Sequence, residues 1–229
     1  MLTALRSLVT QQDAPTQNTM KKVHQLLDYA FTHPNSVITY HASNMVLAVH
    51  SDALYLSKSN ARSRVGGHVF MSNNSADPPN NGAVLSFAQI IKAVMSSAAK
   101  AKLGALYINF REAIPACNTL IDMGHPQPLM PVQTDNTTAL GVVNNTIALR
   151  RTKAMDMRFH WLCNRIQQLQ FRHYLMPGPY NKGDYVTKQH SIIHHMATHT
   201  TYLTPRTIID ALWRMCARAR LERSTARVC

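Results

Sequence analysis

Two kinds of apolar pattern divide the chain into predicted strands and helices. Runs rich in Val, Leu and Tyr that alternate with polar residues, bounded by Asn, Ser and Gly, are typical of β-strands. They predict strands over 36–40, 45–56, 62–71 and 82–87 in the first half and over 130–134 and 171–176 in the second. The Gly66–Gly67 pair in the third of these strands is expected to mark a β-bulge.

Apolar residues spaced three or four positions apart predict helices around these strands. They predict a first helix through Leu2 and Leu8 and others over 19–32, 88–123, 136–144, 154–169, 180–188 and 207–222. Pro115 is expected to kink or split the third helix, because proline has no backbone N–H to donate. Gly124 is expected to end it.

The resulting order, β-β-β-α-β-α-α-β-α, is typical of an α/β protein. Short links between the first three long strands favour an antiparallel meander, and the later strands alternate with helices. The expected fold is therefore a mixed five-stranded sheet with three antiparallel strands first and helices on both faces.

The charge of the chain narrows the choice of partner. Its 229 residues include 24 Lys and Arg against 11 Asp and Glu, which gives a formal net charge of +13. Such an excess favours nucleic acid or another anionic surface as the partner. The alternative is a basic protein without a polyanionic partner.

Cysteine usage and hydropathy indicate the cellular compartment in which the protein is expected. Its four cysteines, Cys117, Cys163, Cys216 and Cys229, show no CxxC spacing, which favours a reducing compartment and argues against a zinc ribbon. Neither a signal peptide nor an apolar stretch long enough to span a membrane is recognisable. We therefore expect an intracellular protein, cytoplasmic or nuclear, with no membrane partner.

Three aspartates stand out in this basic chain. Asp135 directly follows a predicted strand and precedes a predicted helix, a position where α/β proteins tend to place metal or phosphate ligands. Asp52 shares a strand face with Val46 and Ala48, so its carboxylate needs a partner. With Asp184, these acids suggest a Mg²⁺ site that acts on a polyanion. The alternative is three unrelated surface or capping acids.

Four histidines near the C-terminal end form a second candidate cluster. They follow a spacing that could place them on one helix face, as in some metal sites: His190, His194, His195 and His199. No cysteine or acid joins the run, which argues against a zinc site.

Six short words in fixed order carry a family resemblance. They are His50-Ser51-Asp52-Ala53, Arg62 to Phe70, Ser96-Ser97-Ala98-Ala99, Gln133-Thr134-Asp135-Asn136, Lys153 to His160 and Gly183 to Lys188. With these words the chain resembles the ribonuclease H domain of copia-type retrotransposon polyproteins. The resemblance implies three parts: the helical end of a reverse transcriptase over 1–44, a ribonuclease H-like domain over 45–190, and a basic tail with one helix over 191–229.

The resemblance also implies a site and a reaction. In that family four carboxylates hold two Mg²⁺ ions, which drive hydrolysis of the RNA strand of an RNA–DNA hybrid. Asp52, Asp135 and Asp184 match three of the ligands. The fourth ligand is a glutamate early in the long helix, where both candidate positions hold lysine here, Lys100 and Lys102, and Lys102 stands at the favoured one.

This substitution puts the activity in doubt, because lysine offers hydrogen-bond donors and no acceptor for a cation. Our hypothesis is that Lys102 pairs with Asp52 and Asp135, with Asp184 as a further candidate partner, and that cleavage is weak or absent. The alternative is an exposed Lys102 on a solvated helix face.

Several basic residues are expected to contact nucleic-acid phosphates if the resemblance holds. They are Arg62, Arg64, Arg150, Arg151, Lys153, Arg158 and Arg172, with His160 as a further candidate. Three functions remain open: a nuclease that works with a reverse-transcriptase partner, a non-catalytic nucleic-acid-binding module, and a decayed fragment without activity.

Overall fold

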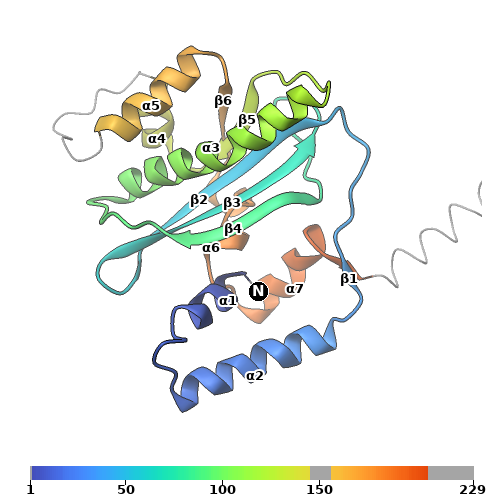
Figure 1. Ribbon diagram of the computed structural model, residues 1–229, viewed down its shortest axis with the longest axis vertical. Coiled ribbons are helices and arrows are strands. Elements are labelled where there is room, and N and C mark those ends of the chain that lie inside the picture. The colour runs from blue at the N-terminus through green and yellow to red at the C-terminus, as the bar shows by residue number, and fades with distance from the viewer. Residues whose placement is uncertain (1, 145–155, 206–229) are drawn as a thin grey trace, which may run out of the picture.

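The computed structural model describes residues 2–144 and 156–205 and is built around a five-stranded sheet (Figure 1). In spatial order its strands are β4 (Ala83–Ile90), β3 (Arg62–Ser72), β2 (Val46–Lys58), β5 (Met130–Thr134) and β6 (Phe171–Leu175). The first three pair antiparallel, whereas β5 pairs parallel with β2, and β6 pairs parallel with β5. The predicted mixed sheet is thus confirmed, with β2 at its centre.

Helices cover both faces of the sheet. The long helix α3 (Ala98–Asp122) crosses one face, and α4 (Thr137–Val143) and α5 (Asp156–Gln167) lie on the same side of the molecule (Figure 1). The one-turn helix α6 (Asp184–Thr187) contacts β2, β3 and β4 from the other face. The main hydrophobic core lies between α3 and the sheet, where Phe110 stacks on Phe171 with ring centroids 3.8 Å apart.

At the Gly66–Gly67 pair, α6 packs closely against one face of β3 and α3 packs closely against the other. A Cβ at Gly66 would lie 2.8 Å from Val186 Cγ2 of α6, and one at Gly67 would overlap Asn109 Oδ1 of α3. The pairing of β2 with β3 runs through both glycines without a register shift. The expected bulge at this pair is therefore wrong, and the glycines serve close approach on opposite faces.

The long helix differs from its prediction at the start and in the middle. The segment expected to begin the helix at residue 88 instead extends β4 to Ile90, and α3 begins at Ala98 with Ser97 as its N-cap. Pro115 does not split α3. Proline removes one hydrogen bond, to the carbonyl of Arg111, and this residue is exposed, so water can satisfy the carbonyl.

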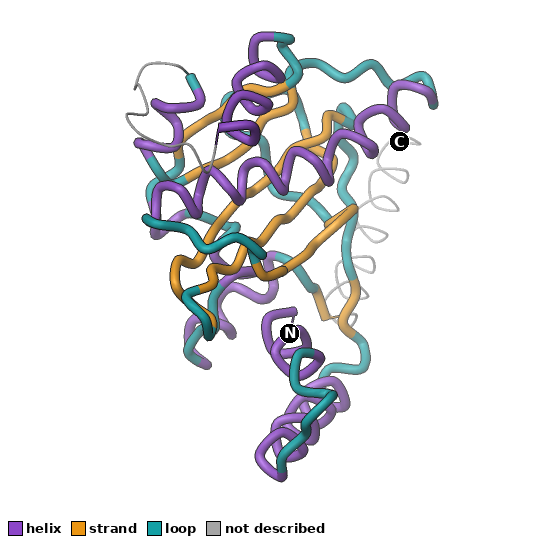
Figure 2. The backbone as a smooth tube through the Cα atoms, turned by 60° about the vertical axis from the view of Figure 1, so that its left-hand side comes forward, coloured by secondary structure: helices purple, strands orange, loops and turns teal. Residues whose placement is uncertain are grey.

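The N-terminal and C-terminal parts of the described chain meet below the sheet. They contribute α1 (Leu2–Val9), α2 (Gln17–Thr32) and α7 (Ile192–Thr198), and two short 3₁₀ helices lie at Gly178–Tyr180 and His199–Thr201. Figure 2 shows α1 and α2 at one end of the molecule, beyond the sheet. The strand expected over 36–40 is shorter, β1 (Ser36–Val37), and pairs with β7 (Thr204–Pro205) outside the main sheet.

Two predictions lie wholly or partly outside the described residues, namely the helix over 207–222 and the start of the helix over 154–169. Among the helices that the structure does describe, none combines the length and the apolar character needed to cross a membrane.

Candidate functional site

The three aspartates singled out by the sequence converge at one end of the sheet. Asp52 lies on β2, Asp135 directly follows β5, and Asp184 begins α6. β2 and β5 are parallel neighbours with His50 opposite Gln133, so Asp52 in the middle of β2 lies beside Asp135, where β5 has just ended. Ligand oxygens from the three residues lie within 4.8 Å of one another, and within the described ranges no other His, Cys, Asp or Glu cluster is placed to hold a metal ion.

Local signals in the sequence place these side chains. Asn136 caps α4 by accepting a hydrogen bond of 2.7 Å from the Ala139 N–H, so the chain turns into a helix immediately after Asp135. Ser97 caps α3 in the same way, which sets Lys102 in the second turn of that helix. The end of α3 that carries Lys102 therefore reaches the aspartate cluster.

The Lys102 ammonium lies between two of the three carboxylates. It is ion-paired with Asp52 Oδ1 and lies 2.6 Å from Asp135 Oδ1 and 2.8 Å from Asp135 Oδ2. The Lys102 side chain is 13 % exposed and that of Asp52 is fully buried, so water screens the Asp52 pair poorly. The hypothesised pairing of Lys102 with Asp52 and Asp135 is present, and an exposed Lys102 is excluded.

Hydrogen bonds from α6 and the preceding loop complete the surroundings of Asp52. Thr187 Oγ1 donates to Asp52 Oδ2, and Asn181 Nδ2 donates to Oδ1 over 3.2 Å. Burial alone would raise the pKa of Asp52, but the charge of Lys102 and the hydrogen bonds from Lys102 and Thr187 outweigh it and lower the pKa. The sequence analysis assigned no role to Thr187 or Asn181, although both lie within three residues of Asp184.

Lys102 is held in its charged form by the same contacts. Burial opposes the ammonium, but the charges of Asp52 and Asp135 and their hydrogen bonds raise the pKa of Lys102 above its usual value. Lysine and Asp52 therefore both carry their charges at neutral pH.

Asp184 has a different partner and a different electrostatic state. It pairs with Lys188, one turn further along the chain, over 2.5 Å, and its Oδ1 is buried without a hydrogen-bond partner. Burial and the neighbouring charge of Asp52 raise the pKa of Asp184 to about 6, against the opposing effect of Lys188. Asp184 is thus less firmly ionised than Asp52.

The fit of this site to divalent metal ions is poor. The three carboxylates alone supply the oxygen ligands that Mg²⁺ prefers. The ammonium of Lys102, however, lies within hydrogen-bond distance of two of them and would repel a cation placed there. As the side chains stand, the residues present do not fit the two ions that the resemblance implies.

Some of the residues expected to contact phosphates are exposed, and others already make contacts within the protein. Arg62 and His160 are exposed, and Arg158 lies over the Tyr107 ring at 5.5 Å from its centroid. Arg172 donates to the backbone carbonyls of Ser75 and Ala76. Arg150, Arg151 and Lys153 lie outside the described residues.

Arg64 is not available as an exposed phosphate contact. Its side chain is buried, at 4 % exposure, and its guanidinium donates to the carbonyl of Thr187 over 3.4 Å. Because Arg64 lies on the face of β3 that α6 covers, we correct its assignment to a residue that holds α6 against the sheet.

The C-terminal histidines do not gather into a metal site. His195 accepts or donates hydrogen bonds with the hydroxyls of Tyr29 and Tyr185, at 2.8 and 3.0 Å. His190 and His194 stack on each other with ring centroids 4.4 Å apart. These rings connect α7 with α2 and α6 instead of converging on one point.

Comparisons with known proteins return ribonucleases H among solved structures. LC11-RNase H1, isolated from compost by a metagenomic approach, is 12 % identical with a TM-score of 0.47, and the match covers 62 % of this chain and 92 % of that one. The same enzyme in complex with an RNA/DNA hybrid is 12 % identical with a TM-score of 0.46, covering 61 % and 92 %. The protease–reverse transcriptase of prototype foamy virus is 10 % identical with a TM-score of 0.34, covering 62 % of this chain and 18 % of that one.

No protein-family model matches the chain, and no curated protein matches it. The class of fold is defined by the structure itself. The strand order is β4-β3-β2-β5-β6, the pairing is antiparallel in one part and parallel in the other, and helices cover both faces. This arrangement of strands and helices is a ribonuclease H-like fold.

Proposed function

We propose that this chain is a ribonuclease H-like domain of copia-type retrotransposon origin that binds RNA–DNA hybrids and whose two-metal hydrolysis is impaired by Lys102. The proposal divides the chain into the end of a reverse-transcriptase part over 1–44, the ribonuclease H-like domain over 45–190 and a basic tail over 191–229. A reverse-transcriptase domain is the expected protein partner. Six sequence words in the family's order support this origin.

Nucleic-acid binding is supported by the net charge of the chain and by polar side chains that reach its surface. The net charge of +13 favours a polyanion, and Arg62, Arg158 and His160 leave polar groups on the surface. The ribonuclease H neighbour solved with an RNA/DNA hybrid suggests which polyanion to test. Recognition of such a hybrid would depend on its shape, its phosphates and the 2′-hydroxyls of the RNA strand.

Impaired hydrolysis is supported by one observation, the position of the Lys102 ammonium between Asp52 and Asp135. A metal ion could bind those carboxylates only after the ammonium left a site in which two aspartates hold it. Breaking a buried ion pair costs about 3–5 kcal/mol. In a site of four acids, metal ions relieve the repulsion between carboxylates. Here the ammonium of Lys102 relieves it, so the domain is expected to fold without metal ions.

A hybrid-cleavage assay tests this proposal. With Mg²⁺ or Mn²⁺ and a labelled RNA–DNA hybrid, wild type is expected to cleave no faster than Asp52→Asn, while both bind the hybrid in the presence of EDTA. Lys102→Glu restores a fourth carboxylate and is expected to gain metal-dependent cleavage. Lys100→Glu makes the same charge change two residues earlier on α3, outside the ion-pair cluster, and should gain nothing.

The outcomes separate the competing functions. Wild-type cleavage well above that of Asp52→Asn would make the chain an active nuclease and would refute the impairment. Hybrid binding that weakens with salt, without cleavage, supports the binding module. No binding of any nucleic acid at moderate salt would leave the decayed fragment as the correct description.

A further inference from the structure

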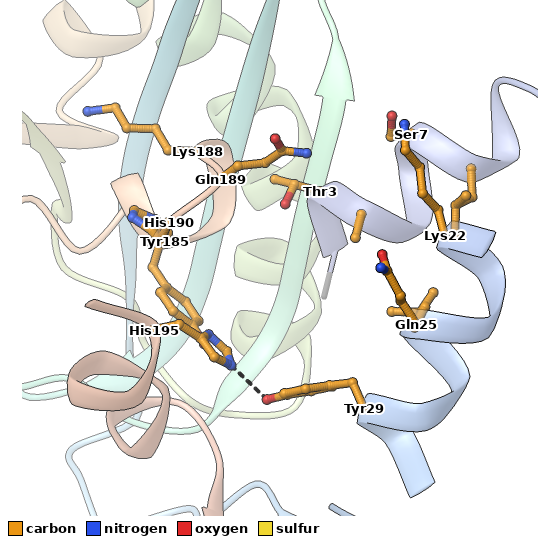
Figure 3. A pocket seen from close by; sticks show the side chains of 13 residues that line it. Thr3, Ser7, Lys22, Gln25, Tyr29, Tyr185, Lys188, Gln189, His190 and His195 are labelled. Carbon is orange, nitrogen blue, oxygen red and sulfur yellow. Dashed lines mark hydrogen bonds between the residues drawn. The ribbon is translucent and has the colours of Figure 1, made fainter. Parts of the chain in front are cut away.

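A large cavity lies apart from the aspartate cluster, between the N-terminal helices and the segment 185–195. Its volume is about 550 Å³, within the range of small-molecule sites. Figure 3 shows side chains of α1 and α2 on one side of it and those of α6 and the chain after it on the other. Neither Asp52, Asp135 nor Lys102 lines it.

A hydrogen-bonded bridge holds the two sides of the cavity together. The Tyr29 hydroxyl of α2 bonds to His195 Nε2 over 2.8 Å (Figure 3). The Tyr185 hydroxyl of α6 bonds to Nδ1 of the same ring over 3.0 Å. Tyr185 in turn stacks on Tyr202, with ring planes 2° apart. The cavity is therefore framed by fixed aromatic side chains.

The polar lining of the cavity suits an anion. No Asp or Glu is among its lining residues. Lys22 makes no ion pair within the described part of the chain and reaches toward Ser7 in Figure 3, whereas Lys188 turns away from the cavity to pair with Asp184. Gln25 and Gln189 add amide donors at the rim. One unpaired cation beside hydroxyl and amide donors is a combination that binds phosphate.

The remaining wall of the cavity is apolar. Ala4 and Leu8 of α1 and Leu26 of α2 line it, all of them only partly buried by the protein itself. A ligand that fills the cavity must therefore present a flat or apolar part to this wall and an anionic part to Lys22. A nucleotide has both parts, a base and a phosphate.

We propose that this cavity binds a nucleotide unit, with its phosphate at Lys22 and Ser7 and its base against Leu8 and Leu26. The unit comes either from a free mononucleotide or from the end of a single strand. The site would lie between the N-terminal helices and the segment that begins with Tyr185 at the end of the ribonuclease H-like domain. It does not depend on whether the aspartate cluster cleaves anything.

Calorimetric titration of the full chain tests the proposal with four probes: AMP, adenosine, inorganic phosphate and 5′-phosphorylated tetrathymidylate. AMP or the tetranucleotide is expected to bind saturably and more tightly than adenosine or phosphate alone. The C2–H resonances of His190 and His195 should shift on binding, which locates the ligand. Shifts with AMP identify a free nucleotide as the source, and shifts with the tetranucleotide alone identify a strand end.

Two variants at the rim of the cavity and one matched control test whether binding occurs in this cavity. Lys22→Gln is expected to weaken binding about tenfold, because it removes a charge-assisted hydrogen bond. Gln25→Glu, which places a carboxylate at the exposed rim, should abolish it. Lys21→Gln removes the same charge from the neighbouring residue, which does not line the cavity, and should leave binding unchanged. Equal effects of Lys21→Gln and Lys22→Gln, or no saturable binding by either nucleotide probe, would overturn the proposal.

Discussion

Two lysine–aspartate contacts lie side by side in this domain, and the pKa values of their carboxylates are shifted in opposite directions. Lys102 comes from α3 to meet Asp52 and Asp135, 50 and 33 positions away in the chain, and is largely buried. Lys188 meets Asp184 within a single turn, and both are partly exposed, at 37 % and 20 %. The first contact lowers the pKa of Asp52, whereas the pKa of Asp184 remains raised to about 6.

The difference shows that the strength of an ion pair depends on what surrounds it. Asp52 has a buried ammonium and two hydrogen-bond donors from α6 and its loop, which together outweigh its burial. Asp184 has a partner that water screens, one oxygen without any partner, and the Asp52 charge nearby. Four substitutions, taken from the largest expected effect to the smallest, test this contrast.

Lys102→Met is expected to be the most damaging. It leaves Asp52 fully buried without its cation, and loss of one partner of a buried pair typically lowers the free energy of unfolding by about 3–5 kcal/mol. Urea unfolding at pH 7 measures the loss. The loss should shrink as the pH falls and the unpaired carboxylate takes up a proton; a change below 1 kcal/mol at pH 7 would mean that the pair contributes no more than a surface one.

Thr187→Val removes the hydroxyl that donates to Asp52 and keeps the shape of the side chain. A hydrogen bond to a charged group contributes about 1.5–3 kcal/mol, so we expect a loss near 2 kcal/mol in the free energy of unfolding. The double variant with Lys102→Met should lose less than the sum of the two single losses, because both act on the same carboxylate. Strict additivity would show that the two contacts are independent.

Asp184→Asn is expected to stabilise the domain at neutral pH. The folded pKa of Asp184, about 6, lies above its usual value of 3.8, so its proton favours the folded state. In wild type this group makes the free energy of unfolding rise as the pH falls from 7 through 6 toward 4. The asparagine should remove this dependence and add about 1–2 kcal/mol at pH 7.5 and nothing at pH 4. Stabilisation of equal size at both pH values would contradict the raised pKa.

Lys188→Met should have the smallest effect on stability. Partly exposed pairs one turn apart contribute about 0.3–0.5 kcal/mol. The informative measurement is the carboxyl carbon shift of Asp184 against pH, followed by NMR. Its pKa should rise further without the lysine, while that of Asp52 changes little. A fall in the Asp184 pKa would show that Lys188 is not its partner.

The sheet and the aspartate cluster could be predicted from the sequence because local patterns carry them. Alternating apolar residues defined the strands, and the words around Asp52, Asp135 and Asp184, through the family resemblance, grouped the three acids in one site. The family resemblance placed Lys102 at a ligand position beside the acids, and its pairing with Asp52 and Asp135 then followed from charge. Their role as metal ligands remains a prediction.

What the sequence did not reveal depends on contacts between distant segments. Arg64 was expected to contact phosphates because it flanks the acids in the topology that the resemblance implies, but α6 covers it. The Gly66–Gly67 pair was expected to form a bulge. The sequence does not show that helices pack closely on both faces at this point, which is why side chains are excluded there. The packing of α7 depends on hydrogen bonds from His195 to Tyr29 of α2 and Tyr185 of α6, and Tyr29 lies far from the other two in the chain.

Lys102 also has a consequence for how fast a polyanion can reach the sheet edge. Three aspartates with Lys102 and Lys188 carry one net negative charge when all are ionised, instead of the excess that four carboxylates would create. The chain as a whole carries a formal net charge of +13, so one residual negative charge at the site adds little repulsion against an approaching phosphate chain. The association rate constant with nucleic acid should therefore be insensitive to divalent cations at constant ionic strength, and electrostatic steering is supplied by the protein alone.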